Sequence, residues 1–179
     1  MLRSNHTTNS PKKHSLLAGA FLVLVIVGAK IDLDLGGLVS FTLQTLFLGL
    51  AYYYLPTLWS LFLVLSYLAL GAVGIPVFNG GVGWNYFVSW PLGFFIGFVL
   101  AAAVPSPSSN GLMPALSFFL KIHVVIAIAG IVGVARYGGS YSSALETAID
   151  ILPGAVIKSA AAALIVFGMD RWYKRKDTL

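Results

Sequence analysis

The chain has 179 residues, of which 58% are hydrophobic and only 9% are charged, and its formal net charge is +5. Soluble domains carry about 25% charged residues, so the composition excludes an ordinary soluble enzyme and indicates an integral membrane protein. The chain has no cysteine, which excludes disulfides, thiol nucleophiles and cysteine zinc sites. We therefore expect a lipid bilayer as its environment and no nucleic-acid partner, because no basic groove with interleaved aromatic residues is present.

Apolar segments fill most of the chain and predict an all-α integral membrane protein with six transmembrane helices. Each segment approaches the length of about 20 residues that crosses the hydrocarbon core of a bilayer. Polar or glycine- and proline-rich stretches separate them, including a predicted outer loop at 136–150. We expect a disordered cytoplasmic tail at 1–15, a membrane domain at 16–172 and a basic cytoplasmic tail at 173–179. The six segments are approximately 16–35, 38–55, 59–75, 86–104, 115–134 and 152–169.

Basic residues gather at the two ends of the chain. Cytoplasmic flanks of membrane spans are enriched in Lys and Arg, and an even number of spans places both ends on one side. The sequence therefore predicts that both termini are cytoplasmic. Seven of the 11 Lys and Arg residues lie in these flanks: Arg3, Lys12, Lys13, Arg171, Lys174, Arg175 and Lys176.

The last apolar segment contains one charged residue, Lys158. A lysine near the bilayer centre costs about 2.5 to 3.5 kcal/mol on insertion scales, so such residues usually face a cavity, a partner or a ligand. Pro153 suits the first turn of a helix, and a helix beginning there places Lys158 near its N-terminus. The helix N-terminus and the lysine ammonium both favour an anion. The alternative is that the long side chain of Lys158 extends to the membrane interface.

A glycine-rich loop at 76–85 is the second candidate site. Asn79, Gly80, Gly81 and Trp84 offer amide groups, an exposed backbone and an aromatic wall, as small-molecule sites require. An ordinary turn explains the same residues equally well.

Other polar and aromatic residues in the spans have mainly structural interpretations. Gln44 and Thr45 are in position to hydrogen-bond a ligand, although contacts between helices are the more common role of buried amides. Lys121 and His123 are interpreted as interface residues. Packing or lipid contact is the first interpretation for several aromatic residues, one or two of which are expected at a site: Phe41, Phe47, Tyr67, Trp90 and Phe94.

Motifs for catalysis or nucleotide hydrolysis are missing from the sequence. It has no G-x-x-x-x-G-K-[ST], no H-E-x-x-H and no G-x-S-x-G, which are the signatures of a P-loop, a zinc protease and a hydrolase nucleophile. We expect a protein that is not an enzyme, that has no cofactor or metal, and that lacks an ATPase motif of its own.

Three motifs together resemble the BioY family, the biotin-specific substrate-binding (S) components of energy-coupling-factor (ECF) transporters. The sequence VSFTLQTLF at 39–47 is similar to the family pattern V-P-F-T-L-Q-T-L-F, and LGAVGIPVF at 70–78 runs into Gly80 and Gly81. The third motif, LPG at 152–154 followed by Lys158, resembles P-G-D-x-x-K. The resemblance implies six transmembrane helices in a bacterial inner membrane and capture of biotin from the outer side. It also implies partners, namely an ECF transmembrane coupling subunit and two ATPase subunits.

The chain departs from the family pattern where Ala155 replaces the aspartate of the third motif and Ser40 replaces the proline of the first. On this resemblance, Lys158 is expected to hold a ligand oxygen, most naturally a carboxylate. Asn79 and Gln44 are expected to meet the other polar groups, Trp84 or Tyr86 to cover the rings, and Gly80 and Gly81 to approach the ligand. Another vitamin, a biotin precursor, or a non-catalytic accessory role are the alternatives.

Overall fold

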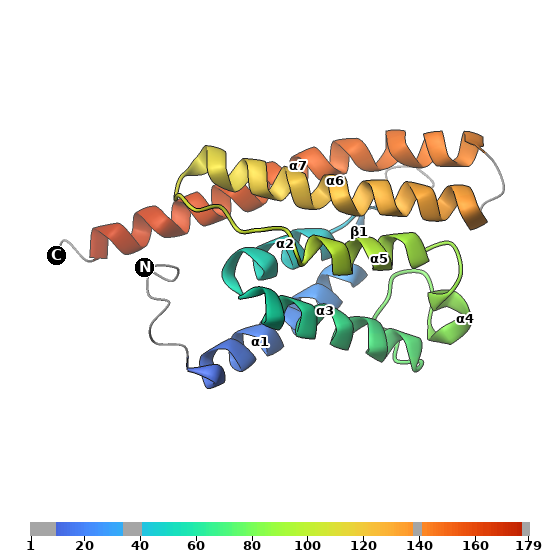
Figure 1. Cartoon of the computed structure of the whole chain (residues 1–179), viewed down its shortest axis with the longest axis horizontal. Helices are drawn as coiled ribbons and strands as arrows, with labels where there is room; N and C mark the ends of the chain where they lie inside the picture. Colours follow the sequence, from blue (N-terminus) through green and yellow to red (C-terminus); the bar gives the residue numbers. More distant parts are fainter. Residues whose placement is uncertain (1–9, 34–40, 138–140, 177–179) are drawn as a thin grey trace.

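Helices make up most of the computed structural model, which describes residues 10–33, 41–137 and 141–176 (Figure 1). A short antiparallel ladder pairs Asp32 with Thr42. The elements in chain order are α1 (Pro11–Lys30), β1 (Asp32–Leu33), β2 (Phe41–Thr42), α2 (Gln44–Tyr54), α3 (Thr57–Ala72), α4 (Gly83–Phe87), α5 (Leu92–Ala101), α6 (Leu112–Tyr137) and α7 (Tyr141–Lys176).

The six predicted segments correspond to α1, α2, α3, α4 with α5, α6 and α7. The first helix begins at Pro11, so the last five residues of the predicted disordered tail are helical, while 1–9 lie outside the described residues. The second helix begins at Gln44 because the preceding Phe41 and Thr42 pair with β1 instead of joining a helix. Residues 34–40, at the junction of the first two predicted spans, are also outside the described part of the chain.

The predicted fourth span is two helices. Pro91 is the N-cap of α5, and a turn separates it from α4. Proline lacks the N–H that a helix interior needs, and its ring disfavours helical backbone at the preceding residue. The predicted segment at 86–104 is therefore not one continuous helix.

The largest correction concerns the last helix. α7 begins at Tyr141, so the predicted outer loop at 136–150 is largely helical, and Pro153 lies inside α7 and not in its first turn. Membrane helices tolerate an internal proline when neighbouring groups compensate for the lost hydrogen bond. Lys158 therefore does not lie near a helix N-terminus, and the proposed anion site at such an end was wrong. The helix also continues to Lys176 through most of the predicted basic tail.

Glycines bring α5 and α6 into close contact. A Cβ atom on Gly93 would lie 2.3 Å from the carbonyl oxygen of Ala129, and one on Gly133 would lie 2.7 Å from the Cα of Gly93. Small residues at helix interfaces allow this kind of backbone approach in membranes. The aromatic side chains on other faces of α5 are thus held at a fixed distance from α6.

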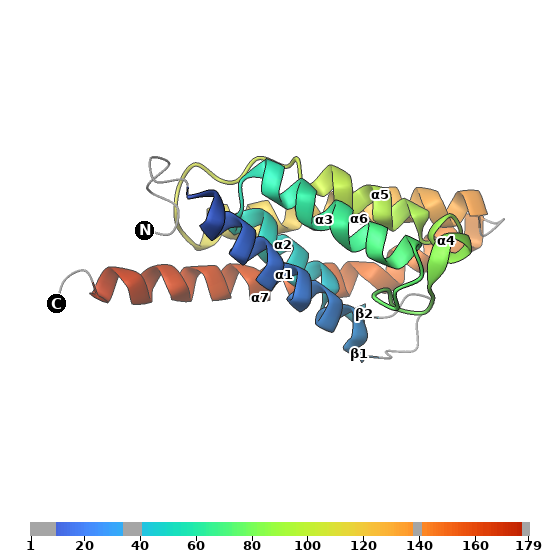
Figure 2. The same ribbon diagram turned by 90° about the horizontal axis from the view of Figure 1, so that it is seen from below.

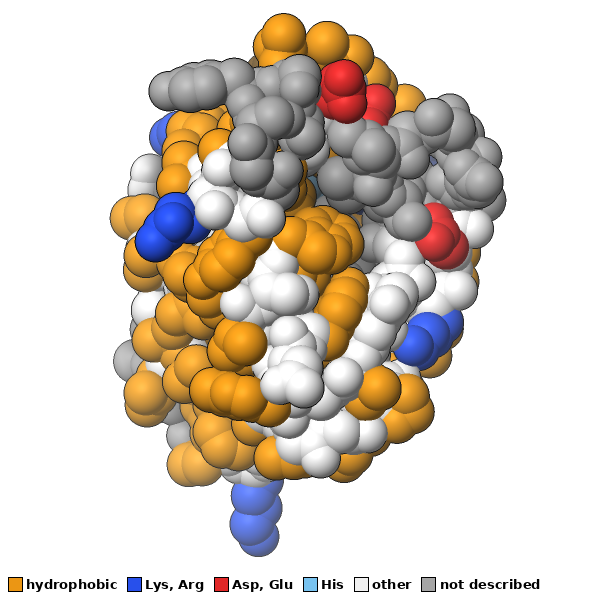
Figure 3. Space-filling model, turned by 90° about the vertical axis from the view of Figure 1, so that its right-hand side faces the viewer, with side chains coloured by type: hydrophobic (Ala, Val, Ile, Leu, Met, Phe, Trp, Pro, Cys, Tyr) orange, Lys and Arg blue, Asp and Glu red, His pale blue; other side chains and the backbone are white. Residues whose placement is uncertain are grey.

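α1 begins and α7 ends at the same end of the bundle (Figures 1 and 2), as the predicted even number of crossings requires. Within the part of the chain that the structure describes, three helices are long and apolar enough to cross a membrane: α1, α6 and the part Ala144–Tyr173 of α7. At the opposite end, near α4, hydrophobic side chains lie around areas of other side chains and backbone, and few of the described side chains in view are charged (Figure 3). The helices enclose a core of aliphatic and aromatic side chains contributed by α1, α2, α3, α5, α6 and α7.

Candidate functional site

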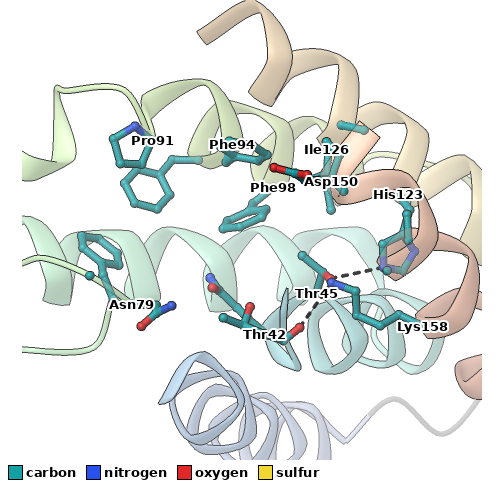
Figure 4. Close-up of a pocket in the computed structure, with 18 of the residues that line it drawn as sticks. Thr42, Thr45, Asn79, Pro91, Phe94, Phe98, His123, Ile126, Asp150 and Lys158 are labelled. Atoms are coloured by element: carbon teal, nitrogen blue, oxygen red, sulfur yellow. Dashed lines mark hydrogen bonds between the residues drawn. The ribbon is translucent and has the colours of Figure 1, made fainter. Parts of the chain in front are cut away.

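A cavity of about 260 Å³ lies among α2, α3, α5, α6 and α7 and reaches the loop before α4. Its size is close to the lower end, about 300 Å³, of the range for small-molecule sites. Polar groups converge on it from several helices (Figure 4). Its aromatic walls consist of Tyr67, Phe78, Tyr86, Trp90, Phe94, Phe95 and Phe98.

Lys158 lines this cavity from α7, as the sequence predicted. Its Nζ atom donates a hydrogen bond of 3.2 Å to the carbonyl oxygen of Thr42. Thr42 belongs to β2, just before α2, so its carbonyl lies outside the hydrogen-bond pattern of that helix. The ammonium is therefore held inside the bundle, and the interpretation that it extends to the membrane interface is not supported. Lys158 also has a further interaction within the protein.

Gln44 connects α2 to α3 beside the cavity. Its side-chain amide donates a 3.0 Å hydrogen bond to the hydroxyl of Tyr67, which in turn donates to the carbonyl oxygen of Val77 at 3.2 Å. Gln44 is buried and Tyr67 is fully buried. The interpretation of Gln44 as a contact between helices is confirmed, and Gln44 also lines the cavity.

His123 is the central polar residue that the sequence interpretation missed. It is 4% exposed, and its Nδ1 lies 2.9 Å from both the carbonyl oxygen of Phe119 and the hydroxyl of Ser159. Its Nε2 lies 3.2 Å from the hydroxyl of Thr45. A proton on Nδ1 accounts for the Phe119 contact, because a carbonyl only accepts, and Nε2 then accepts from the hydroxyl of Thr45.

This network joins α2, α6 and α7 next to Lys158, so the interface role predicted for His123 was wrong. Lys121, two residues earlier on α6, is exposed. Residues separated by two positions point to nearly opposite sides of a helix. The two-residue spacing from Lys121 was therefore the signal in the sequence that His123 faces the interior of the bundle.

The glycine-rich loop forms one end of the cavity. Gly80 has φ +83°, a conformation that glycine adopts without strain. The hydroxyl of Tyr86 donates to the carbonyl oxygen of Asn79 at 2.6 Å, and the Asn79 side-chain amide donates to Asp32 at 2.9 Å. Lys30 also donates to the carbonyl oxygen of Phe78. The end of α1 and β1 therefore hold this loop over the cavity.

The other loop residues named from the sequence divide into two groups. Asn79, Gly80 and Tyr86 line the cavity, whereas Gly81 and Trp84 do not. Trp84 is 62% exposed and stacks on Phe87 with 5.5 Å between ring centroids. Gly81 lies against the Tyr86 ring, where a Cβ atom would come within 2.1 Å of it. Tyr86 is thus the residue of the Trp84/Tyr86 pair that is placed to cover a ligand.

Asp150 lines the cavity as well, although the sequence interpretation placed it in an outer loop. In Figure 4 its carboxylate is directed from α7 into the space beside α5. Tyr67, Trp90 and Phe94 also line the cavity, more than the one or two aromatic residues expected.

The chain was compared with protein families and with known proteins. The model of the BioY family matches residues 4–175. A protein named biotin transporter BioY from Rhizobium etli is 30% identical over 158 residues, covering 80% of this chain and 84% of that protein. One named probable biotin transporter BioY from Pyrococcus horikoshii is 30% identical over 86% of this chain and 93% of that protein. The biotin transporter BioY of Thermotoga maritima is 41% identical, but the match spans only 49% of this chain and 52% of that protein.

A solved structure, the S-component for biotin from an ECF-type ABC transporter, superposes with a TM-score of 0.80. It covers 93% of this chain and 95% of the solved chain at 18% identity. This likeness confirms the all-α fold of the S-component type. The related proteins are transporters, which confirms the prediction of a transporter subunit and not an enzyme. From the match along nearly its whole length, the chain belongs to the BioY family.

Proposed function

We propose that this protein binds biotin in the cavity beside Lys158 and serves as the substrate-binding subunit of a biotin importer. The proposal rests on the half-buried Lys158 within a cavity that has aromatic walls and hydrogen-bonding groups from several helices. The names of the related proteins point to the same ligand.

Biotin has an apolar fused ring system with a ureido group at one end and a carboxylate at the other. A small-molecule site needs apolar walls and a few placed polar groups. Phe94, Phe98 and Tyr86 provide walls, and Lys158 provides the cation for a carboxylate. Gln44 and Asn79 are available for the remaining polar atoms, because each has an amide oxygen whose hydrogen bonds are not used by the contacts described above.

Thermal unfolding of the detergent-purified protein distinguishes this function from its alternatives. A ligand at 100 times its dissociation constant stabilises a protein by about 2.7 kcal/mol. We expect biotin to raise the melting temperature, with desthiobiotin weaker and riboflavin and thiamine without effect. Stabilisation by another vitamin alone would show a different substrate, and no stabilisation by any of them would favour a non-catalytic accessory subunit.

We further propose that the cavity opens to the outside of a bacterial inner membrane and that both termini are cytoplasmic. Lys12 and Lys13 at the start of α1 lie at the same end of the bundle as the basic end of α7, and the cavity lies toward the other end. Positive flanks favour the cytoplasmic side. Cysteines introduced at Ser10 and at Met113 in cells would be expected to stay unlabelled by an impermeant thiol reagent, whereas one at Gly83 is labelled.

The proposed partners are an ECF transmembrane coupling subunit and two ATPase subunits. Of the small residues on α1, Ala18 is buried inside the protein, whereas Gly19 and Ala20 are exposed. No atom lies within 4 Å of a Cβ placed on Gly19, which leaves room for another helix. We expect Gly19→Leu to reduce biotin uptake in cells that contain such partners while leaving biotin binding to the purified subunit unchanged. Equal uptake by the variant would remove this face from the proposal.

A further inference from the structure

Two oppositely charged side chains of α7, Asp150 and Lys158, line the same cavity. Gly154, halfway between them, lines it too. Residues at positions i, i+4 and i+8 lie along one side of a helix, and eight residues span about 12 Å of its axis. In Figure 4 both charged groups are directed from α7 into the space between α2 and α5. The cavity therefore has an anionic and a cationic group separated along its length.

The two groups have complementary hydrogen-bonding chemistry. An ionised carboxylate only accepts hydrogen bonds and an ammonium only donates them. Phe94, Phe98 and Ile126 contribute apolar surface to the same lining, and polar contacts are stronger in such low-dielectric surroundings. A ligand with N–H donors at one end and a carboxylate at the other matches this arrangement in only one orientation.

We propose that Asp150 is a specificity-determining residue that accepts hydrogen bonds from the N–H groups of the ligand, while Lys158 binds its carboxylate. The inference rests on the proposed function and extends it, because it assigns the cyclic urea of biotin to the Asp150 end of the cavity. It predicts selection for ligands with unsubstituted urea nitrogens over ligands of the same shape that lack the N–H donors.

A purely structural role for Asp150 leads to a different expectation. Asp150 and Lys158 both have other interactions within the protein, so loss of a structural carboxylate would lower the affinity for every ligand by a similar factor. Loss of a recognition group lowers the affinity only for ligands that donate to it. The ratio of two affinities separates the roles.

The test measures equilibrium binding of biotin and of biotin methylated on both urea nitrogens to wild-type protein, Asp150→Ala and Asp150→Asn. Glu146→Ala is the matched control, because Glu146 is an exposed carboxylate one turn earlier on α7 and outside the cavity lining. Because hydrogen bonds to charged groups contribute strongly to binding free energy, we expect Asp150→Ala to weaken biotin binding about 10- to 100-fold. The affinity of Asp150→Ala for the methylated ligand should differ from that of wild type by less than about threefold. The affinities of Glu146→Ala for both ligands should also stay within about threefold of wild type.

Asp150→Asn keeps the shape of the side chain and is expected to lose part of the same preference, so it carries the test if Asp150→Ala does not fold. Melting temperatures without ligand report on folding. Equal losses for both ligands, or no loss for biotin, would overturn the inference while leaving the proposed function in place. If wild-type protein bound no biotin, the proposed function would be wrong and the inference would fall with it.

Discussion

Replacing His123 with leucine tests whether the network beneath the cavity holds α2, α6 and α7 together. Leucine has a similar volume and no polar atom, so it removes the contacts with Thr45, Ser159 and the Phe119 carbonyl without leaving a large void. Ser159 is 0% exposed, and a buried polar group that loses its partner costs about 1 to 3 kcal/mol.

Thr45 is half-buried and contributes a smaller loss. Together these effects predict that His123→Leu lowers the free energy of unfolding by about 2 to 4 kcal/mol, which corresponds to a fall in melting temperature on the order of 10 °C for a chain of this size. We also expect weaker biotin binding, because Thr45 and Lys158 are positioned by the helices that His123 joins. His123 is thus a positioning residue.

The assay is thermal unfolding in detergent with and without biotin, with Lys121→Leu as control. Lys121 lies on the same helix but is exposed, so its replacement removes a polar side chain outside the network. A melting temperature for His123→Leu equal to that of wild type, together with unchanged biotin affinity, would refute this reasoning.

Two further predictions concern the packing and the polar contacts of the site. Gly93→Ala places a Cβ atom 2.3 Å from the carbonyl oxygen of Ala129, and overpacking of this kind costs about 1 to 3 kcal/mol. Thermal unfolding should show this loss of stability. The control is Gly168→Ala, where no atom lies within 4 Å of the added Cβ, and it should leave stability unchanged or slightly higher. Tyr67→Phe removes the hydroxyl that Gln44 donates to and should lower the free energy of unfolding by about 1 to 3 kcal/mol. Equal melting temperatures for wild type and either variant would contradict the corresponding argument.

The fold class followed from the sequence because hydropathy over about 20 residues reports directly on membrane insertion. Element boundaries were less predictable. Pro153 followed by Gly154 has the features of a helix start, but inside a bundle the surrounding helices can stabilise a continuous helix through a proline. The opposite outcome at Pro91, where the helix does break, shows that the local sequence does not decide between these cases.

Part of the candidate site was predictable from residue type and part depended on packing. Lys158 was found because a charge in an apolar segment is costly and usually functional. His123 satisfied the same criterion, but its proximity to Lys121 in sequence obscured that the two face opposite sides of α6. Asp150 was missed because the error at Pro153 placed it in a loop. The exposure of Trp84 depends on how α4 packs, which spacing in the sequence does not specify.

Equilibrium binding of labelled biotin to the detergent-purified protein, with Lys158→Ala measured beside Lys121→Ala, tests whether Lys158 belongs to a biotin site. Both variants remove one lysine from a membrane helix, but of the two only Lys158 lines the cavity among α2, α3, α5, α6 and α7. We expect saturable binding that Lys158→Ala weakens at least about tenfold, because a hydrogen bond to a charged group is lost. Lys121→Ala should leave the binding unchanged. Equal binding by wild type and Lys158→Ala would contradict the assignment of Lys158 as the ligand's cation, and no binding by wild type would contradict the proposed function.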